Sequence, residues 1–181
     1  MSIVPGVIDL RPYCTAIEDQ GNLGSCTGNA IAGLIEYLSR KARKTTDVSR
    51  LFIYYYERLL EGTVNYDSGA YIRDGIKACY TYGAPLESLW PYNINAFANK
   101  PSNQAYTDAA TRKVTGYQRC TDFNSVKNAL AAGNPVTIGF DVYDSFESDT
   151  VAATGMMPYP NIATEQLLGG HCVLLVGYDN S

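Results

Sequence analysis

The chain has 181 residues, 46% of them apolar, so it is long enough to bury the core of one sizeable domain or of two small lobes. Its net charge of −4 and its isoelectric point near 4.9 argue against nucleic acid or an anionic membrane as the main partner. The composition also excludes a disordered or fibrous protein.

The N-terminus lacks the basic segment and the long apolar run of a signal peptide, and no later stretch approaches the roughly 20 apolar residues of a membrane helix. We therefore expect a cytoplasmic protein, or a virion-associated one if the source is viral. The five cysteines are widely spaced and form neither a disulfide framework nor a C-x-x-C metal motif. Reduced thiols are expected, and no cofactor is implied.

After a short strand or arm over Ile8–Tyr13, the glycine-rich segment that begins at Gln20 predicts a tight turn into a helix over Cys26–Ser39. At a helix start, free N–H groups and the helix dipole favour a thiolate and can bring its pKa below neutrality. The Gln20 amide can turn back over Cys26 and, with the Cys26 N–H, supply two donors for an oxyanion. Cys26 is therefore a candidate nucleophile; a buried, inert cysteine is the alternative.

Two further helices are predicted in the first half of the chain. One covers Leu51–Leu60, with Ser49 as a candidate N-cap. The face that it turns inward carries Leu51, Tyr54, Tyr55 and Leu59. The other helix is expected to open at Asp67 and to run to about Tyr82, where Gly83 stops it.

The second half of the chain is richer in predicted strands. Residues 93–111 lack clear periodicity and predict a connecting excursion. Strands are expected over residues 113–119 and 135–142, with a helix between them over residues 122–132, and residues 143–168 predict a long loop. This change in pattern predicts a helical lobe followed by a sheet-based lobe, with a cleft between them.

The single histidine, His171, stands at the start of an apolar run that predicts a strand to Tyr178. A thiol nucleophile needs a base with a pKa near neutrality, and only this side chain meets that need without a large shift. A zinc site made by Cys26, His171 and Cys172 is a weak alternative, because no fourth ligand is placed. A purely structural histidine is the other alternative.

Two motifs resemble those of the papain-like cysteine peptidases. The segment Gln20–Cys26 reads Q-G-N-L-G-S-C, similar to the family's Q-G-x-x-G-S-C. The segment 170–178 reads G-H-C-V-L-L-V-G-Y, similar to the family's G-H-A-V-x-x-V-G-Y with a cysteine in the alanine position. The 145 residues between the cysteine and the histidine also fit the papain and cathepsin signature.

The departures from the family pattern are informative. Leu23 stands where secreted members usually have a disulfide cysteine, and Thr27 stands where an aromatic residue commonly follows the nucleophile. These replacements resemble the bacterial and viral branch of the family. A mature-like segment also starts within ten residues of Met1, which suggests a member without a propeptide.

The resemblance implies a papain-like, two-lobe α+β fold. Residues 14–110 would form the mainly helical lobe that carries the nucleophile, and residues 1–13 and 111–181 the sheet-based lobe that carries the histidine. The implied activity is thiol-dependent hydrolysis of a peptide or protein substrate through an acyl-enzyme. In that scheme Cys26 is the nucleophile, His171 is the base and Gln20 is the oxyanion donor. The implied substrate-binding residues are Ser68, Gly69 and Gly170.

One element of the family pattern has no counterpart here. The family places an asparagine that orients the histidine some sixteen residues after it, whereas this sequence ends at Ser181. A strand from His171 to Tyr178 travels about 23 Å at roughly 3.3 Å per residue, so Asn180 at its far end is not expected to reach back. We therefore expect the C-terminal strands of the sheet lobe to be missing.

The missing strands have two expected consequences. The apolar edge at residues 173–176 is left unpaired and open to self-association or to a partner chain. The histidine either takes its orientation from another group or works less well. The alternative function is a catalytically impaired papain-like binding or assembly module, and a less favoured one is acyl transfer or cleavage of a non-peptide amide.

Overall fold

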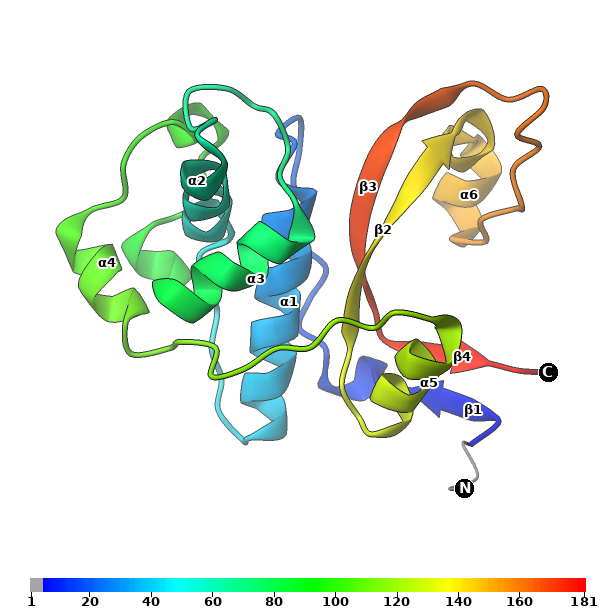
Figure 1. Cartoon of the computed structure of the whole chain (residues 1–181), viewed down its shortest axis with the longest axis horizontal. Coiled ribbons are helices and arrows are strands. Elements are labelled where there is room, and N and C mark those ends of the chain that lie inside the picture. Colours follow the sequence, from blue (N-terminus) through cyan, green and yellow to red (C-terminus); the bar gives the residue numbers. More distant parts are fainter. Residues whose placement is uncertain (1–4) are drawn as a thin grey trace.

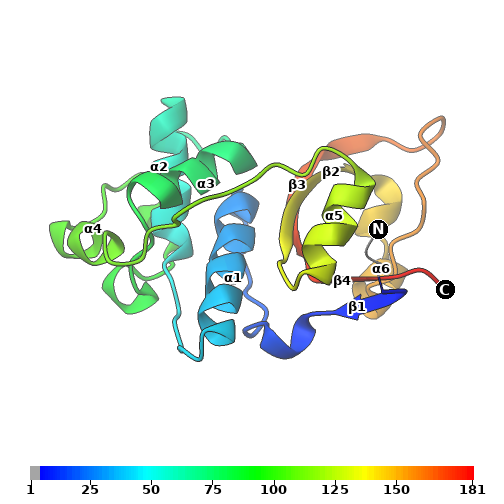
Figure 2. The same ribbon diagram turned by 60° about the horizontal axis from the view of Figure 1, so that its bottom comes forward.

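The computed structural model describes residues 5–181, so the first four residues of the predicted sheet lobe lie outside the described part. One lobe is built of helices, and the other holds the strands together with two short helices (Figure 1). The rotated view shows the same division, with helix α1 (Cys26–Lys41) between the other helices of its lobe and the strands (Figure 2). None of the helices in residues 5–181 is long and apolar enough to cross a membrane.

The helical lobe contains α1, α2 (Arg50–Glu61), α3 (Ile72–Thr81) and α4 (Asn103–Ala109), joined partly by the short 3-10 turns η2 (Glu87–Leu89) and η3 (Ile94–Ala96). The Ser49 hydroxyl accepts a hydrogen bond from the Phe52 N–H at 3.1 Å and caps α2 as predicted. Ile31 of α1, Ile53 of α2 and Cys79 of α3 pack into one buried cluster. Burial of these apolar side chains holds the three helices together.

The sheet lobe is built from two antiparallel ribbons. Strand β2 (Val136–Tyr143) pairs with β3 (Leu167–Leu175), and β1 (Val7–Asp9) pairs with β4 (Gly177–Asp179). Helix α5 (Phe123–Ala131) begins with a capping box at Asp122 and packs against the ribbons. The short elements η1 (Arg11–Tyr13), η4 (Asp144–Glu147) and α6 (Asp149–Thr154) complete the lobe.

The two lobes meet where α1 packs against β3. A β-carbon built on Gly33 of α1 would lie 3.6 Å from a methyl group of Leu174, an ordinary van der Waals separation. The Thr15 hydroxyl donates a 2.7 Å hydrogen bond to Glu36 of α1, so the arm that follows β1 is also tied to this helix. The first residue of α1, Cys26, is thereby placed beside the sheet lobe.

The predicted helices over residues 26–39, 51–60 and 122–132 and the predicted strand over residues 135–142 are confirmed, but the third helix begins at Ile72 and not at Asp67. Asp67 does not act as an N-cap, because its carboxylate accepts hydrogen bonds from the Gly24 N–H and the Tyr54 hydroxyl. The predicted inward face of α2 is wrong at one position, because Leu59 is 43% exposed.

Two predictions for the middle of the chain are wrong. Residues 113–119 form no strand; the Val114 N–H donates to the Cys79 carbonyl at 3.2 Å, so this segment is fastened to the end of α3 and crosses between the lobes as an irregular chain (Figure 1). A strand-like pattern needs a neighbouring strand to satisfy its backbone, and none is offered here. Residues 103–109, expected as part of a connecting excursion, form α4 with Ser102 as its cap.

The strand that carries the histidine is longer than predicted. His171 is the fifth residue of β3, not the first of a strand that runs to Tyr178, and Gly177–Asp179 form the separate strand β4. The extension exists because β2 continues to Tyr143 and pairs with Leu167 across a register shift. The predicted loop over residues 143–168 is likewise interrupted by η4 and α6.

Candidate active site

Cys26 is half-buried at the first position of α1, where its N–H has no acceptor within the helix. Burial raises the pKa of the Cys26 thiol above its ordinary value. The backbone N–H groups of Cys172, Thr27 and Cys26 act in the opposite direction, because donors near the sulfur stabilise its anion. The expectation that the helix start lowers this pKa is therefore wrong for the chain as described, since desolvation outweighs the donors.

The Gln20 side chain turns back over its own loop. Gly21 adopts a positive φ of 58°, and the Gln20 Nε2 atom donates a 3.0 Å hydrogen bond to the Leu23 carbonyl. The Ser25 N–H donates to the same carbonyl at 2.7 Å, which closes the turn just before Cys26. A side-chain amide carries two hydrogens, so Gln20 keeps a second one for another acceptor.

A carboxylate on the loop before α3 fastens this turn to the predicted substrate loop. Both Asp67 oxygens lie 3.0 Å from the Gly24 nitrogen, and the Tyr54 hydroxyl bonds to the same carboxylate. The Gly69 N–H donates to that hydroxyl at 3.2 Å. Ser68 is exposed, and its hydroxyl donates to Thr63 at 2.9 Å. The loop of Ser68 and Gly69 is therefore tied to the turn that carries Gln20, through contacts that the sequence did not reveal.

His171 lies on β3 opposite Phe140. Its ring makes an edge contact with Phe140, with the ring centres 5.7 Å apart, and lies 6.2 Å from the ring centre of Phe146. These aromatic side chains limit where the imidazole can turn.

A pocket of about 330 Å³ brings the two lobes together in one site. Gln20 of the helical lobe and His171 and Gly170 of β3 line it, and Val142, Phe146 and Leu168 supply apolar wall. Ser68 and Gly69 are not part of this wall. Cys26 is not part of this wall, but it begins α1, the helix that packs against β3, the strand of His171.

Asn180 does not take the place of the asparagine that orients the histidine in the family pattern. Its side-chain oxygen accepts a 2.5 Å hydrogen bond from Lys127, and its N–H donates to Gly6, so it belongs to the β1–β4 ribbon. Nor do the described residues contain a group of three or more His, Cys, Asp or Glu side chains placed to hold a metal ion.

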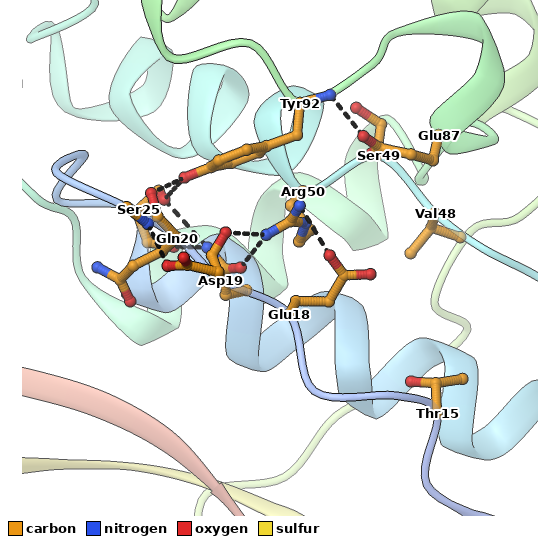
Figure 3. A network of polar contacts seen from close by, with 12 residues as sticks. Thr15, Glu18, Asp19, Gln20, Ser25, Val48, Ser49, Arg50, Glu87 and Tyr92 are labelled. Carbon is orange, nitrogen blue, oxygen red and sulfur yellow. Dashed lines mark hydrogen bonds and ion pairs between the residues drawn. The ribbon is translucent and has the colours of Figure 1, made fainter. Parts of the chain in front are cut away.

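Sequence reasoning also missed a polar network behind the turn, which Figure 3 shows from close by. Arg50 forms a 2.7 Å ion pair with Glu18 and donates to the Asp19 carbonyl at 3.1 Å. The Tyr92 hydroxyl donates to the Gln20 carbonyl at 2.8 Å. No local pattern could have revealed these contacts, because they join residues 31 and 72 positions apart.

Residues 15–181 match the model of the Peptidase_C39 like family. The chain is 41% identical to an uncharacterised peptidase C1-like protein of Acanthamoeba polyphaga mimivirus, over 99% of this chain and 62% of that protein. It therefore spans less than two thirds of the length of this relative.

Solved structures give the same picture. Xylellain, a cysteine protease from Xylella fastidiosa, is 40% identical, with a TM-score of 0.89 over 98% of this chain and 71% of that one. Digestive procathepsin L 3 of Tenebrio molitor is 20% identical, with a TM-score of 0.73 over 98% of this chain and 56% of that one, and supports the fold alone. The predicted α+β papain-like fold is confirmed. By fold and by sequence, the chain belongs to the papain-like cysteine peptidases.

Proposed function

We propose that this chain hydrolyses peptide bonds through a thioester formed on Cys26, with His171 as acid and base and Gln20 as an oxyanion donor. The main support is that Gln20 and His171, from different lobes, line one pocket. Cys26 begins α1, the helix that packs against the strand of His171. This arrangement supports a nucleophile and an amide donor from the start of the chain acting with a base from its end.

In this mechanism the Cys26 thiolate adds to the carbonyl carbon of the scissile bond, and the carbonyl oxygen becomes an oxyanion. The Cys26 N–H and the second hydrogen of the Gln20 amide stabilise that charge. The His171 imidazolium gives its proton to the leaving nitrogen as the C–N bond breaks. His171 then takes a proton from water, which attacks the thioester and returns the sulfur as thiolate.

The proposal requires the charge of His171 to offset the burial of Cys26. Burial alone raises the pKa of the Cys26 thiol, which would leave little thiolate at neutral pH. A neighbouring imidazolium stabilises the thiolate and extends its reactivity to lower pH. The alkylation rate of Cys26 should therefore stay high in mildly acidic solution and lose that acid shoulder in His171→Ala.

The test measures peptide turnover and alkylation by a limiting thiol-directed epoxide. Cys26→Ala should reduce turnover to the buffer rate, and His171→Ala should reduce it by on the order of 10³-fold or more. Cys120→Ala is the matched control, because Cys120 is also half-buried but lies on the other lobe, outside the pocket. The proposal is wrong if turnover survives Cys26→Ala, or if Cys26 reacts no faster than Cys120 near about pH 6.

A further inference from the structure

The turn that carries Gln20 is supported from behind by Arg50 and Tyr92, which belong to neither predicted motif (Figure 3). We propose that these two side chains are positioning residues that fix the backbone of Gln20 and so aim its amide at the oxyanion. This inference rests on the proposed peptidase mechanism and adds residues to it.

The contacts fall on both sides of one α-carbon. Arg50 donates to the Asp19 carbonyl, which belongs to the peptide plane before Gln20, and Tyr92 donates to the Gln20 carbonyl, which belongs to the plane after it. Fixing both planes fixes φ and ψ of Gln20 and hence the direction of its Cα–Cβ bond. The bond from its Nε2 atom to Leu23 then sets the amide itself.

The hydrogen bonds in the network can run in only one direction. The Gln20 carbonyl can only accept a hydrogen bond, so the Tyr92 hydroxyl donates its single hydrogen to it. The Ser25 hydroxyl, 2.5 Å from Tyr92, must therefore donate to it, and Ser25 in turn accepts from the Asn29 amide at 3.0 Å. Arg50 donates to the carbonyl oxygen of that same amide at 2.7 Å. A continuous chain of donors thus leads from the guanidinium to Gln20.

Arg50 also holds Tyr92 directly. Its guanidinium lies 3.9 Å from the centre of the Tyr92 ring and pairs with Glu18 at 2.7 Å, while the residue as a whole is only 8% exposed. A planar cation suits stacking and forked hydrogen bonding at once, and a lysine cannot reproduce both. The Tyr92 backbone N–H donates to the Glu87 carboxylate, so both the backbone and the hydroxyl of Tyr92 are held by hydrogen bonds.

Such support matters because oxyanion stabilisation depends on placement. A donor displaced by about 1 Å loses much of its effect on the transition state, whereas the binding of a flexible peptide changes little. Loosening the turn should therefore lower kcat with little change in KM. It should also leave the sulfur chemistry of Cys26 intact, because the bonds from Arg50 and Tyr92 to the turn end on the Asp19 and Gln20 carbonyls and on the Ser25 hydroxyl, and none involves an atom of Cys26.

The experiment is a double-mutant cycle on peptide turnover with Tyr92→Phe and Gln20→Ala. Gln20→Ala should lower kcat by on the order of 10²-fold. Tyr92→Phe should lower it about tenfold in the presence of Gln20 but less than about twofold in the Gln20→Ala background. Arg50→Lys, which keeps the charge without the fork, should show the same dependence on Gln20. The epoxide alkylation rate of Cys26 should be unchanged in Tyr92→Phe.

Tyr37→Phe is the matched control, because Tyr37 is a buried tyrosine whose hydroxyl donates to a backbone carbonyl, that of Gly133, far from the turn. The inference is overturned if the losses from Tyr92→Phe and Gln20→Ala multiply, if Cys26 alkylation slows in parallel with turnover, or if Tyr37→Phe costs as much. Hydrogen exchange of the backbone amides of residues 18–24 gives a readout that needs no turnover. If the wild type cleaves no peptide, the proposed function fails, and hydrogen exchange decides the inference. Faster exchange of residues 18–24 in Tyr92→Phe but not in Tyr37→Phe supports it. Unchanged exchange in Tyr92→Phe overturns it.

Discussion

Glu57 of α2 is fully buried, and its carboxyl group lies against the first turn of α1. The Thr27 hydroxyl donates to its Oε1 atom, while Oε2 has no hydrogen-bond partner among the described residues. Burial is the main reason that its pKa rises from the ordinary 4.5 to about 8; Glu61 on α2 and Asp74 on α3 add to the rise, and Thr27 and Arg58 oppose it. Glu57 is therefore held as a neutral acid near neutral pH.

This burial predicts a stability that falls as the pH rises. Between about pH 4.5 and about pH 8 the unfolded chain releases the Glu57 proton while the folded chain keeps it, so the free energy of unfolding decreases through that window and levels off above it. Glu57→Gln, which cannot ionise, should lose less stability from pH 5 to pH 8, by on the order of a few kcal/mol in urea titrations. The exposed Glu147→Gln is the control, and identical pH slopes in both variants would contradict the prediction.

At this same scale, the sequence named candidate site residues that belong to local motifs and missed residues that are defined only by contact. Cys26, Gln20 and His171 could be named because each stands in a short segment whose residue types and spacing can be read directly from the sequence. The helix expected to open at Asp67 begins only at Ile72, and the donors that bind the Asp67 carboxylate come from residues 24 and 54. A carboxylate before a helix is a good cap only when no such donors reach it first.

At the scale of elements, the helices whose ends are capped by nearby residues were predicted well. Ser49 and Asp122 bond to N–H groups three residues ahead, so their effect is visible in the sequence. The strand expected over residues 113–119 failed for the opposite reason: its existence depended on a partner strand that the fold does not supply. The local sequence predicts the type of an element only where residues near in sequence supply the hydrogen-bond partners of its backbone.

The two glycines on opposite faces of α1 give a prediction about helix packing. A β-carbon on Gly28 would lie 2.8 Å from the Arg50 carbonyl oxygen and 3.2 Å from the Tyr54 β-carbon, whereas one on Gly33 would lie 3.6 Å from a Leu174 methyl group. Gly28→Ala should therefore push α2 away and destabilise the fold by about 1–3 kcal/mol, despite the better helix propensity of alanine.

Gly33→Ala is the internal comparison for this helix. It makes the same chemical change in the same element but meets only an ordinary contact, so it should be neutral or stabilise the chain by up to about 1 kcal/mol. Both values come from urea unfolding at one pH. An equal effect of the two substitutions would show that α1 and α2 are not packed as closely as described. Because Arg50 opens α2, Gly28→Ala should also speed hydrogen exchange in residues 18–24.

At the scale of the whole molecule, the candidate site exists only because the lobes meet along α1 and β3. In this arrangement, residues 173–176, which were expected to form an unpaired edge, have hydrogen-bonding partners on one side. Val173, Leu174 and Leu175 pair with β2, and the Val176 carbonyl accepts from Leu10 at 2.7 Å. Within the described residues, however, the other edge of β3 faces no strand.

A free strand edge beside exposed apolar side chains favours association of chains. The segment that leads into β3 exposes Met156, Met157, Tyr159 and Ile162, and the start of β3 exposes Leu167 and Leu168. We therefore expect the sedimentation coefficient to rise with protein concentration, and Leu167→Lys, a charge placed on β3, to suppress that rise. Leu59→Lys is the control, because Leu59 is similarly exposed, at 43% against 53%, but lies on the helical lobe. A chain that sediments as a monomer at every concentration, or equal suppression by both variants, would show that this edge is not where copies meet.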